Sequence, residues 1–394
     1  MKNNIAFIVL KKELTDIFRD RKTLIMSILL PMILLPIISF FIGKVGNDSK
    51  TKVENNVKIA IVDEGNSQFK NYIKAQKNIN ILDSKNIDQD IKDGKFFVAI
   101  YIPKNFDENI NKETKEKLTI KYDNTSTEAT MAVSIVKSYI DSYSKTIVGQ
   151  RLAEKNMDPS ILTPIEVIES TTENKDSGFG KAMAAMLLPL LLMIYSATST
   201  IGAAVDLGAG EKERGTLEPL LTTKANRISL LVGKFLAITI MGILMSIASL
   251  IGVIITMNQA NSMFGTMGDF NLGIGTLGLI MILPILYTMV FGALQLAISI
   301  YARSFKEAQT YLSPMSIIAM VLLYSVMMKD PKNIEGFYFH IPLTNGACLM
   351  KEFLVGIHNY THIAITFGWI AVYIVASILF ARYMFSKEEV IFRA

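Results

Sequence analysis

A short charged stretch, GAGEKERGTLEPLLTTK (residues 208–224), separates two apolar segments of the chain. Four residues lie between Gly210 and Gly215, which is the glycine spacing of the phosphate-binding loop G-x-x-x-x-G-K-[ST]. That loop needs a Lys after its second glycine to reach the β- and γ-phosphates, whereas Thr216 and Leu217 follow Gly215. The stretch also follows an apolar segment and not a buried strand. The sequence therefore does not predict a nucleotide site here.

The second half of the stretch carries the signals of a short helix. Thr216 suits an N-cap position, and Glu218 and Pro219 suit a first turn. Leu220 and Leu221 then begin an apolar face. We expect a short helix on the cytoplasmic surface; the alternative is an ordinary charged turn beside the membrane.

Polar side chains inside the apolar segments are the next candidates for chemistry. Charged residues are costly in mid-membrane and mark function there, but Asp206 and Lys234 lie at segment ends, where we expect them to reach the interface, and Arg303 lies just past a segment. The uncharged polar candidates for a substrate path are Tyr195, Ser196, Thr198, Ser199, Thr200, Gln295 and Ser299. Hydroxyls, with carbonyls freed by prolines, supply the oxygen ligands that Na⁺ prefers. The alternative is that they bond back to their own helix or to a neighbour.

Metal-binding residue types are few. His358 and His362 are four residues apart, a spacing compatible with a metal on one helix face, but no Cys or carboxylate stands in register. We therefore favour interfacial packing for both and predict no metal site. Cys348 is the only cysteine, which excludes an intramolecular disulfide and a cysteine-based zinc site.

The composition indicates a membrane protein. The chain has 394 residues, of which 51% are hydrophobic and 19% charged, with a net charge of +5. Residues 44–181 contain twenty-one basic and twenty-one acidic residues, so the whole positive excess lies in the hydrophobic remainder. That distribution favours membrane orientation over nucleic-acid binding, which needs a contiguous basic face.

Six apolar segments are long enough to cross a bilayer core of about 30 Å. They are residues 23–43, 182–205, 235–257, 274–301, 311–328 and 363–385. Charged residues precede the first segment and no A-x-A-like cleavage site follows it, so we expect it to remain as an anchor.

Lys and Arg in short loops predict orientation, because they are retained on the cytoplasmic side. A cytoplasmic N-terminus places most of them inside, namely Lys2, Lys11, Lys12, Arg19, Arg21, Lys22, Lys212, Arg214, Lys224, Arg227, Arg303, Lys306, Lys387 and Arg393. The opposing loop 258–272 has no Lys or Arg, and the loop 329–361 has three Lys. We expect a multi-pass protein of the cell membrane with both termini in the cytoplasm.

The resulting fold class is an α-helical integral membrane protein with six transmembrane helices and an inserted extracytoplasmic α/β domain between the first and second helices. The expected parts are a cytoplasmic interfacial helix (1–22), the first transmembrane helix (23–43), the α/β domain (44–181), and helices two to six (182–394) with a cytoplasmic coupling loop (206–228) and outer re-entrant or surface helices (about 337–357). Within 44–181 we expect strands at 57–65, 95–103, 117–124 and 164–170, and an amphipathic helix at 128–156.

Two stretches carry a family resemblance. GEKERGTLEPLLTTKANRISLLVGKFLA (210–237) resembles the characteristic loop of type 2 ATP-binding-cassette (ABC) exporter permeases, closest to the sodium-efflux permease (NatB) family. KKELTDIFRDRKTLIMSILLPMILLPII (11–38) is similar to the interfacial entry helix and first span of the same family. The order of spans and outer domain also matches, so the resemblance covers essentially the full length. Both motifs are specific to the permease class and only weakly specific to sodium.

The resemblance implies that the loop contacts an ATPase subunit. The implied coupling residues are Glu211, Lys212, Glu213, Arg214, Gly215, Thr216, Leu217, Glu218, Pro219, Leu220 and Leu221. The implied interfacial helix presents Lys11, Leu14, Ile17, Phe18 and Arg19. The expected partners are a cytoplasmic ABC ATPase subunit, which holds ATP and Mg²⁺, a second permease copy, identical or a paralogue, and membrane lipid, with no nucleic acid. No cofactor is expected on this chain, and it is not expected to be an enzyme.

The leading function is thus the permease subunit of an ABC exporter, with Na⁺ as the substrate. An exporter of a drug, peptide or lipid-like molecule would use the same scaffold. A membrane-anchored sensor with an outer ligand-binding domain is the rival from another class. A membrane-embedded enzyme is disfavoured, because neither paired intramembrane carboxylates nor an H-E-x-x-H motif occurs.

Overall fold

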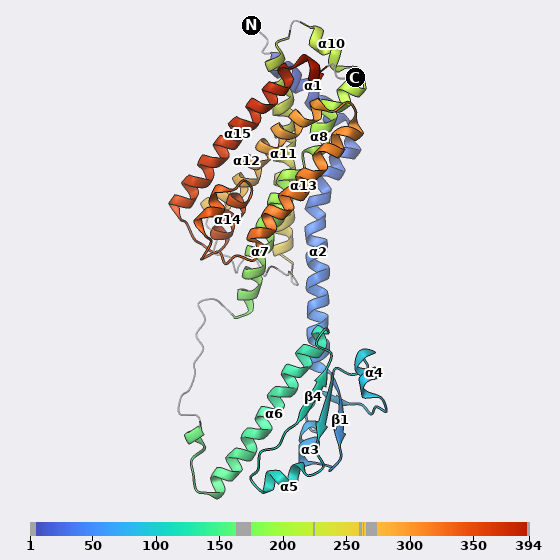
Figure 1. The fold of residues 1–394 in the computed structure, drawn as a ribbon, viewed down its shortest axis with the longest axis vertical. Helices are drawn as coiled ribbons and strands as arrows, with labels where there is room; N and C mark the ends of the chain where they lie inside the picture. Colours follow the sequence, from blue (N-terminus) through green and yellow to red (C-terminus); the bar gives the residue numbers. More distant parts are fainter. Residues whose placement is uncertain are drawn as a thin grey trace. The chain divides into compact units, whose positions relative to one another are not determined.

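The computed structural model describes residues 5–162, 175–223, 225–259, 262, 264 and 274–391. The chain forms two compact units. One, the membrane unit, comprises Met1–Phe41 and Thr172–Ala394. The other, the α/β unit, comprises Ile42–Thr171 (Figure 1).

Within the described residues, six helical stretches are long and apolar enough to cross a membrane, which confirms the expected number of spans. They are Leu24–Asn55, Gly180–Glu213, Arg227–Met257, Gly275–Tyr301, Phe305–Met327 and Tyr360–Ser386. The first runs past residue 43, where the apolar run ends, because the polar residues that follow continue the same helix.

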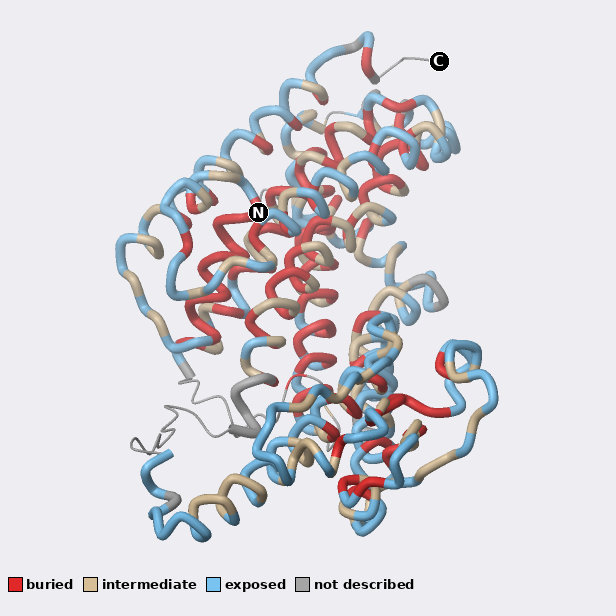
Figure 2. Tube along the Cα trace, turned by 60° about the horizontal axis from the view of Figure 1, so that its bottom comes forward, coloured by how far each residue is buried: buried red, intermediate tan, exposed pale blue. Residues whose placement is uncertain are grey.

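The elements of the membrane unit are α1 (Ile5–Arg19), α2 (Arg21–Asn55, which continues into the α/β unit), α7 (Lys175–Thr198), α8 (Ile201–Val205), η2 (Asp206–Gly210), α9 (Glu211–Glu213), α10 (Leu217–Thr222), α11 (Arg227–Met257), α12 (Ile274–Tyr301), α13 (Phe305–Met327), η4 (Gly336–His340), α14 (Thr344–Leu354), α15 (Tyr360–Ser386) and α16 (Glu388–Ile391). The spans differ in how much of their most apolar part is buried. That share is 50–61% for the spans that contain α7, α11 and α12, and 17–22% for the spans that contain α2, α13 and α15. The first three therefore form the interior, and buried residues follow the central helices in Figure 2.

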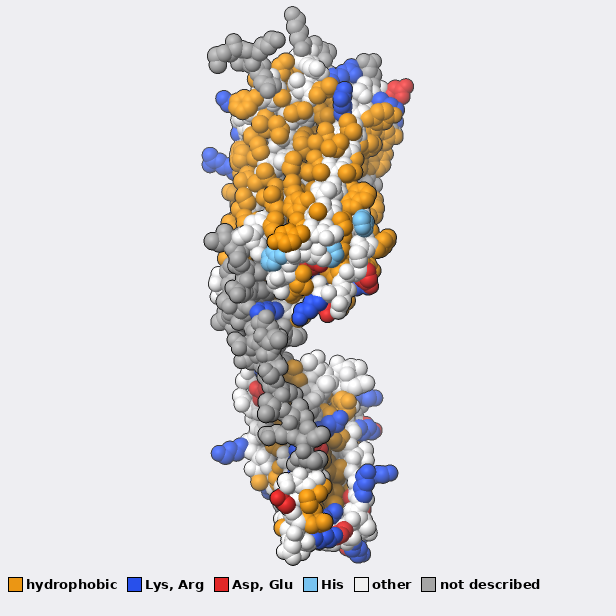
Figure 3. All heavy atoms as spheres, turned by 90° about the vertical axis from the view of Figure 1, so that its left-hand side faces the viewer, with side chains coloured by type: hydrophobic (Ala, Val, Ile, Leu, Met, Phe, Trp, Pro, Cys, Tyr) orange, Lys and Arg blue, Asp and Glu red, His pale blue; other side chains and the backbone are white. Residues whose placement is uncertain are grey.

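Outer helices of the membrane unit expose apolar side chains. On α15 these include Val372, Val375 and Leu379, each more than half exposed. Figure 3 shows hydrophobic side chains covering the visible face of this unit, with charged side chains mainly near its ends. Such a surface is suited to lipid tails or to other membrane helices.

The second span is interrupted at Ser199 and Thr200. After α8 the backbone makes one π-helical turn, η2, and then α9, so the expected loop at 206–228 begins as helix. Gly208 allows this path, because a Cβ atom there would lie 2.4 Å from the Ser299 hydroxyl of α12. The Ser299 hydroxyl accepts from the backbone N–H of Ala209 at 2.9 Å, which holds the turn against α12.

Residues 337–357, expected as re-entrant or surface helices, form part of η4 and all of α14. All eleven residues of α14 are buried. Its core neighbours come from α7, α12, α13 and α15, so α14 is packed among the helices of the membrane unit. A re-entrant or outer-surface position of this segment relative to the bilayer stays a prediction.

The α/β unit contains a four-stranded sheet in the order β2-β1-β3-β4. The strands are β1 (Val57–Asp63), β2 (Ile79–Ile81), β3 (Val98–Ile102) and β4 (Thr119–Tyr122); β1 is parallel to β2 and β3, and β4 is antiparallel to β3. The helices are α3 (Gln68–Lys74), α4 (Ile87–Lys92), α5 (Phe106–Asn111), α6 (Thr127–Glu154) and η1 (Pro159–Leu162).

Helix α6 covers one face of this sheet. Its buried residues Ala129, Ala132, Val133 and Val136 have helical spacing and pack in one cluster with buried residues of β1 and β3. The opposite face has a smaller cluster that includes Ala60 and Ala99.

Three of the expected strands and the long helix are present in this unit. The three-residue β2 was missed, because so short a segment shows no alternation. The strand expected at 164–170 lies outside the described residues.

Candidate functional site

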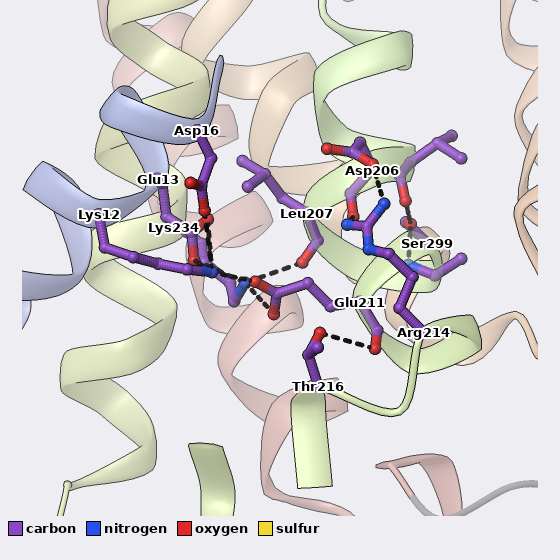
Figure 4. Close-up of polar contacts among 12 residues, drawn as sticks. Lys12, Glu13, Asp16, Asp206, Leu207, Glu211, Arg214, Thr216, Lys234 and Ser299 are labelled. Carbon is purple, nitrogen blue, oxygen red and sulfur yellow. Dashed lines mark hydrogen bonds and ion pairs between the residues drawn. The ribbon is translucent and has the colours of Figure 1, made fainter. Parts of the chain in front are cut away.

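An ion-pair cluster joins three distant parts of the membrane unit, and we call Lys12, Glu13, Glu211 and Lys234 the ion-pair node (Figure 4). The two glutamates and Lys234 are buried, whereas the side chain of Lys12 is 46% exposed. Lys234 of α11 is fully buried. Its ammonium donates to Glu13 Oε1 of α1 at 2.9 Å, Glu211 Oε2 of α9 at 2.6 Å and the Leu207 carbonyl of η2 at 3.0 Å. An ammonium has three donors, so every N–H of Lys234 has an acceptor.

Lys12 of α1 is the second cation of the node. Its Nζ lies 2.6 Å from Glu211 Oε1, 3.2 Å from Glu13 Oε2 and 3.6 Å from Asp16 Oδ2. Burial lowers the pKa of Lys12, but the hydrogen bond to Glu211 and the charges of Glu13 and Glu211 outweigh it, so the pKa lies above its ordinary value. Glu211 therefore bridges two cations, and the node is balanced with two charges of each sign.

Helix packing brings Glu13 to Lys234. Gly233, next to Lys234, lies against α1: a Cβ there would come within 2.7 Å of Val9 and 2.8 Å of the Ala6 carbonyl. Val9 is buried in the same contact, one helical turn before Glu13. The absence of a side chain at residue 233 thus lets α1 approach α11 closely enough for the ion pair to form.

The predicted coupling residues follow directly from Glu211. Arg214 Nη1 pairs with Asp206 Oδ1 at 2.8 Å, and this hydrogen bond raises the pKa of the guanidinium. Gly215 has a φ of 67°, a left-handed conformation that glycine adopts without strain, and it ends the α9 turn. Thr216 is the N-cap of α10, as expected by position, but its hydroxyl donates to the Glu211 carbonyl and does not cap α10.

Two further contacts fasten the loop to other helices. The Phe305 backbone N–H, at the start of α13, donates to Glu213 Oε2 at 2.7 Å, and Lys212 Nζ donates to the Val390 carbonyl of α16 at 2.8 Å. Among the predicted coupling residues, the exposed ones are Glu213, Arg214, Gly215, Thr216 and Pro219, those partly buried are Lys212 and Leu220, and those buried are Glu211 and Leu217. The side chains of Glu218 and Leu221 lie outside the described residues. Glu211 is therefore a residue of the internal node and not of an accessible surface.

An open groove of about 560 Å³ lies between α1 and the loop. Its lining includes Asp16 and Ile17 of α1 and Arg214, Pro219 and Leu220 of the loop. The predicted interfacial residues Leu14 and Ile17 are partly buried against the core, whereas Lys11, Phe18 and Arg19 are exposed. Helix α1 therefore packs on α11 with one side and leaves the other exposed.

The predicted substrate-path hydroxyls are engaged mainly within the protein. Ser196 and Thr198 donate to the carbonyls four residues earlier, and Tyr195 donates to the Ser27 carbonyl of α2 at 3.0 Å. Thr200 donates to Gln295 Oε1 at 2.8 Å, and Gln295 Nε2 donates to the Ala197 carbonyl at 2.7 Å.

Ser299 donates to the Val205 carbonyl at 3.3 Å. Of the seven predicted side chains, only the Ser199 hydroxyl is buried without a hydrogen-bond partner among the described residues. The alternative of bonding to the same helix or to a neighbouring helix thus describes most of these seven residues. The structure brings Thr200 and Gln295 together, and within the described part of the chain these seven side chains do not form a ring of free oxygens.

Two expectations about charged and ligand-type residues need correction. Lys234 does not reach the interface but is buried in the node, because carboxylates of α1 and α9 are packed against it. His358 and His362 do not share a helix face, because α15 begins at Tyr360. His358 Nε2 contacts the Thr276 hydroxyl at 2.9 Å, and His362 Nδ1 lies 2.6 Å from Glu352 Oε1. Among the described residues, no group of three or more His, Cys, Asp or Glu is placed to hold a metal.

Sequence reasoning missed the node as a unit. Glu13 was available as an acidic residue within a basic amphipathic helix, and Lys234 as a cation within SLLVGKFLAI. The sequence does not indicate that these two residues form a pair, because 221 positions separate Glu13 from Lys234.

Comparison with known proteins gives two matches. A family model described as "ABC-2 family transporter protein" matches residues 21–383. The chain is also 30% identical over 387 residues to the "ABC transporter permease protein NatB" of Bacillus subtilis (strain 168), which covers 97% of this chain and 98% of that protein.

Proposed function

The chain belongs to the ABC-2 transporter family, and we propose that it is the membrane-spanning permease subunit of an exporter whose ATP is hydrolysed on a separate cytoplasmic subunit. Both termini lie in the cytoplasm in this proposal, and the α/β unit lies outside, in accord with the Lys and Arg distribution. A second permease copy completes the assembly, since one chain supplies six spans.

The observation that carries the coupling proposal is the connection of the loop to the spans through the ion-pair node. Residues Glu211–Leu221 receive the ATPase subunit at their exposed side chains, while Glu211 binds Lys234 of α11 and Lys12 of α1. Glu213 extends the connection to α13. A push on the loop is thereby transmitted to three helices as a rigid-body movement.

The groove between α1 and the loop supports the same role. It presents both signs of charge beside the apolar side chains of Ile17 and Leu220, a composition that suits docking of a soluble protein. Its location beside the node means that a partner bound there would contact α1 and the loop together.

We propose Na⁺ as the substrate, on the resemblance of residues 11–38 and 210–237 to sodium-efflux permeases. The test is co-reconstitution with the partner ATPase in inverted vesicles, with ATP-dependent Na⁺ uptake as the readout. Drug, peptide or lipid transport without Na⁺ movement would remove Na⁺ and leave the permease role. Absence of any ATP-driven transport with an assembled complex would contradict the permease role.

Charge reversal at Glu213 tests the loop assignment. Glu213→Lys removes the acceptor of the Phe305 N–H and reverses an exposed loop charge, so we expect ATP-driven transport to be lost while membrane insertion is retained. The matched control is Glu335→Lys, which makes the same charge change beyond the other end of α13, where Glu335 forms an exposed pair with Lys329. Normal transport by Glu213→Lys with the subunits assembled would refute the coupling assignment.

A further inference from the structure

A buried carboxyl group of the membrane unit lies beside a partly exposed imidazole. Glu352 of α14 is 3% exposed, and its Oε1 lies 2.6 Å from Nδ1 of His362 on α15. The side chain of His362 is 21% exposed. The pair thus joins a group that water does not reach to a titratable group that water does reach.

The second oxygen of Glu352 has no hydrogen-bond donor. Its Oε2 is buried and without a partner among the described residues. An ionised carboxylate accepts hydrogen bonds at both oxygens, and leaving one of them buried and unpaired costs free energy. A proton on Oε2 removes the charge that causes this cost and leaves Oε1 free to accept from His362.

The ends of the two helices favour the same protonation state. Glu352 lies in the last turn of α14, where carbonyls without intrahelical partners disfavour a negative charge. His362 is the third residue of α15, where the N–H groups of the first turn disfavour a positive charge. Both helices therefore support a neutral imidazole that donates from Nδ1 and a carboxyl group that binds the proton.

An aromatic side chain fixes the imidazole ring. Phe339 of η4 is buried, and its ring centroid lies 3.9 Å from that of His362, with an interplanar angle of 23°. Stacking of this kind restricts rotation of the ring and keeps Nδ1 directed at Glu352. The position of the donor is thus determined by packing.

His362 is the group that pairs with Glu352. Burial raises the pKa of Glu352, and the hydrogen bond and charge of His362 oppose that rise without cancelling it. Lys351 is adjacent in sequence, but its ammonium donates to carbonyls at and beyond the end of α13. The other titratable side chains at this end of the elements packed against α14 are Cys348 of α14, Lys181 of α7, Tyr287 of α12, Lys329, Asp330, Lys332 and Glu335 between α13 and η4, Tyr338 and His340 of η4, His358 before α15, and Tyr360 and Tyr373 of α15.

We propose that Glu352 and His362 form a proton-binding site, in which Glu352 Oε2 takes up one proton from water while His362 Nδ1–H keeps its hydrogen bond to Oε1. Carboxyl and imidazole groups of this kind carry protons in membrane transporters. A carboxylate accepts a stronger hydrogen bond than a neutral acid, so proton uptake weakens the contact between α14 and α15. The site goes beyond the permease role and does not depend on the transported substrate.

The test is an infrared pH titration of the purified full-length chain in lipid nanodiscs, which records the C=O stretch of protonated carboxyl groups. We expect the wild type to show a carboxyl group that stays protonated above the range of an ordinary Glu, whose pKa is about 4.3. Glu352→Gln should lack this band. His362→Phe keeps an aromatic ring against Phe339 but removes the donor, so the band should persist to higher pH. His362→Gln restores a donor and should shift the titration less.

The matched control is Glu335→Gln, the same change at an exposed carboxylate. The hydrogen bond from Lys329 holds the pKa of Glu335 below its ordinary value, so we expect the band to be unchanged. Loss of the band in this control, or its persistence in Glu352→Gln, would overturn the assignment. A wild type without such a band, or a folded His362→Phe variant that titrates at the same or a lower pH, would also overturn it. None of these measurements requires transport, so failure of the site is distinguishable from failure of the permease role.

Discussion

Among the described residues of the membrane unit, two lysines are buried, and they are held in different ways. Lys234 is paired with Glu13 and Glu211, carboxylates from two other elements. Lys351 of α14 is also buried, but its ammonium donates to backbone carbonyls at and beyond the end of α13, those of Val326 and Met327 at 2.8 Å and that of Lys329 at 2.5 Å.

The neighbours of Lys351 explain why it has no carboxylate partner. Glu352 is adjacent in sequence, but its Oε1 pairs with His362, and burial raises the pKa of Glu352. The end of a helix offers carbonyls without intrahelical partners and a negative partial charge, which suit a cation. A buried lysine can thus join distant charged segments or bind the carbonyls at the end of one helix, and only the first arrangement requires charges from three parts of the chain.

The largest expected effect is on stability when either lysine is replaced. Lys234→Met leaves two buried carboxylates without their main partner, so we expect a loss of about 3–5 kcal/mol. Lys351→Met leaves only neutral carbonyls, and we expect about 1–3 kcal/mol. Denaturant or thermal unfolding in detergent measures both, with the exposed Lys306→Met as a control near zero. A greater loss for Lys351→Met than for Lys234→Met would contradict the distinction.

The two buried lysines should also differ in the pH dependence of stability, and Lys351 is the one expected to show it. Burial lowers the pKa of Lys351 to about 8, against about 10.4 in an unfolded chain. Between the folded and unfolded pKa values of Lys351, the unfolded state binds more protons than the folded state. The contribution of Lys351 to the free energy of unfolding therefore rises with pH over this range, by on the order of 2 kcal/mol. Wild type should therefore gain stability relative to Lys351→Met from pH 7 to pH 10. A difference that stays constant over this range would show that the lysine does not titrate there.

Double-mutant cycles should separate the partners of the two lysines. We expect a coupling energy of about 1 kcal/mol or more between Lys234→Met and Glu13→Gln, because they share an ion pair. Between Lys351→Met and Glu352→Gln we expect less than about 0.5 kcal/mol. Unfolding midpoints of the single and double variants give both values, and equal coupling in the two cycles would be inconsistent with the observed contacts.

The smallest effect is expected at the exposed Arg214–Asp206 pair near the node. Solvent screens this pair, so Arg214→Gln should cost less than about 1 kcal/mol of stability. A cost near that of Lys234→Met would mean that the pair belongs to the buried cluster.

Sequence patterns predicted the elements better than the contacts between them. Six spans followed from apolar length, and the short helix α10 from Thr216 and Pro219. The π-helical turn η2 was not predictable, because it depends on Ser299 of α12 approaching Gly208.

The candidate site was predictable only in part. The charged loop identified Glu211 as a candidate coupling residue. Its pairing with Lys234 and Lys12 inside the protein could not be predicted from pattern or spacing. Likewise, the position of Lys234 near a span end suggested contact with the interface, and only the packing of α1 at Gly233 determines that it is buried. Local periodicity identifies a helix, whereas the partner of a buried charge is determined by tertiary packing.

The most direct test of the account concerns Glu211, which belongs both to the loop and to the ion-pair node. Glu211→Gln keeps the shape of the side chain and removes its charge, and the complex with the ATPase subunit is reconstituted in inverted vesicles. The measurement is the amount of Na⁺ taken up per ATP hydrolysed. We expect continued hydrolysis with uptake per ATP reduced by at least about fivefold, the lower end of typical coupling between sites. An unchanged ratio in the assembled complex would contradict it.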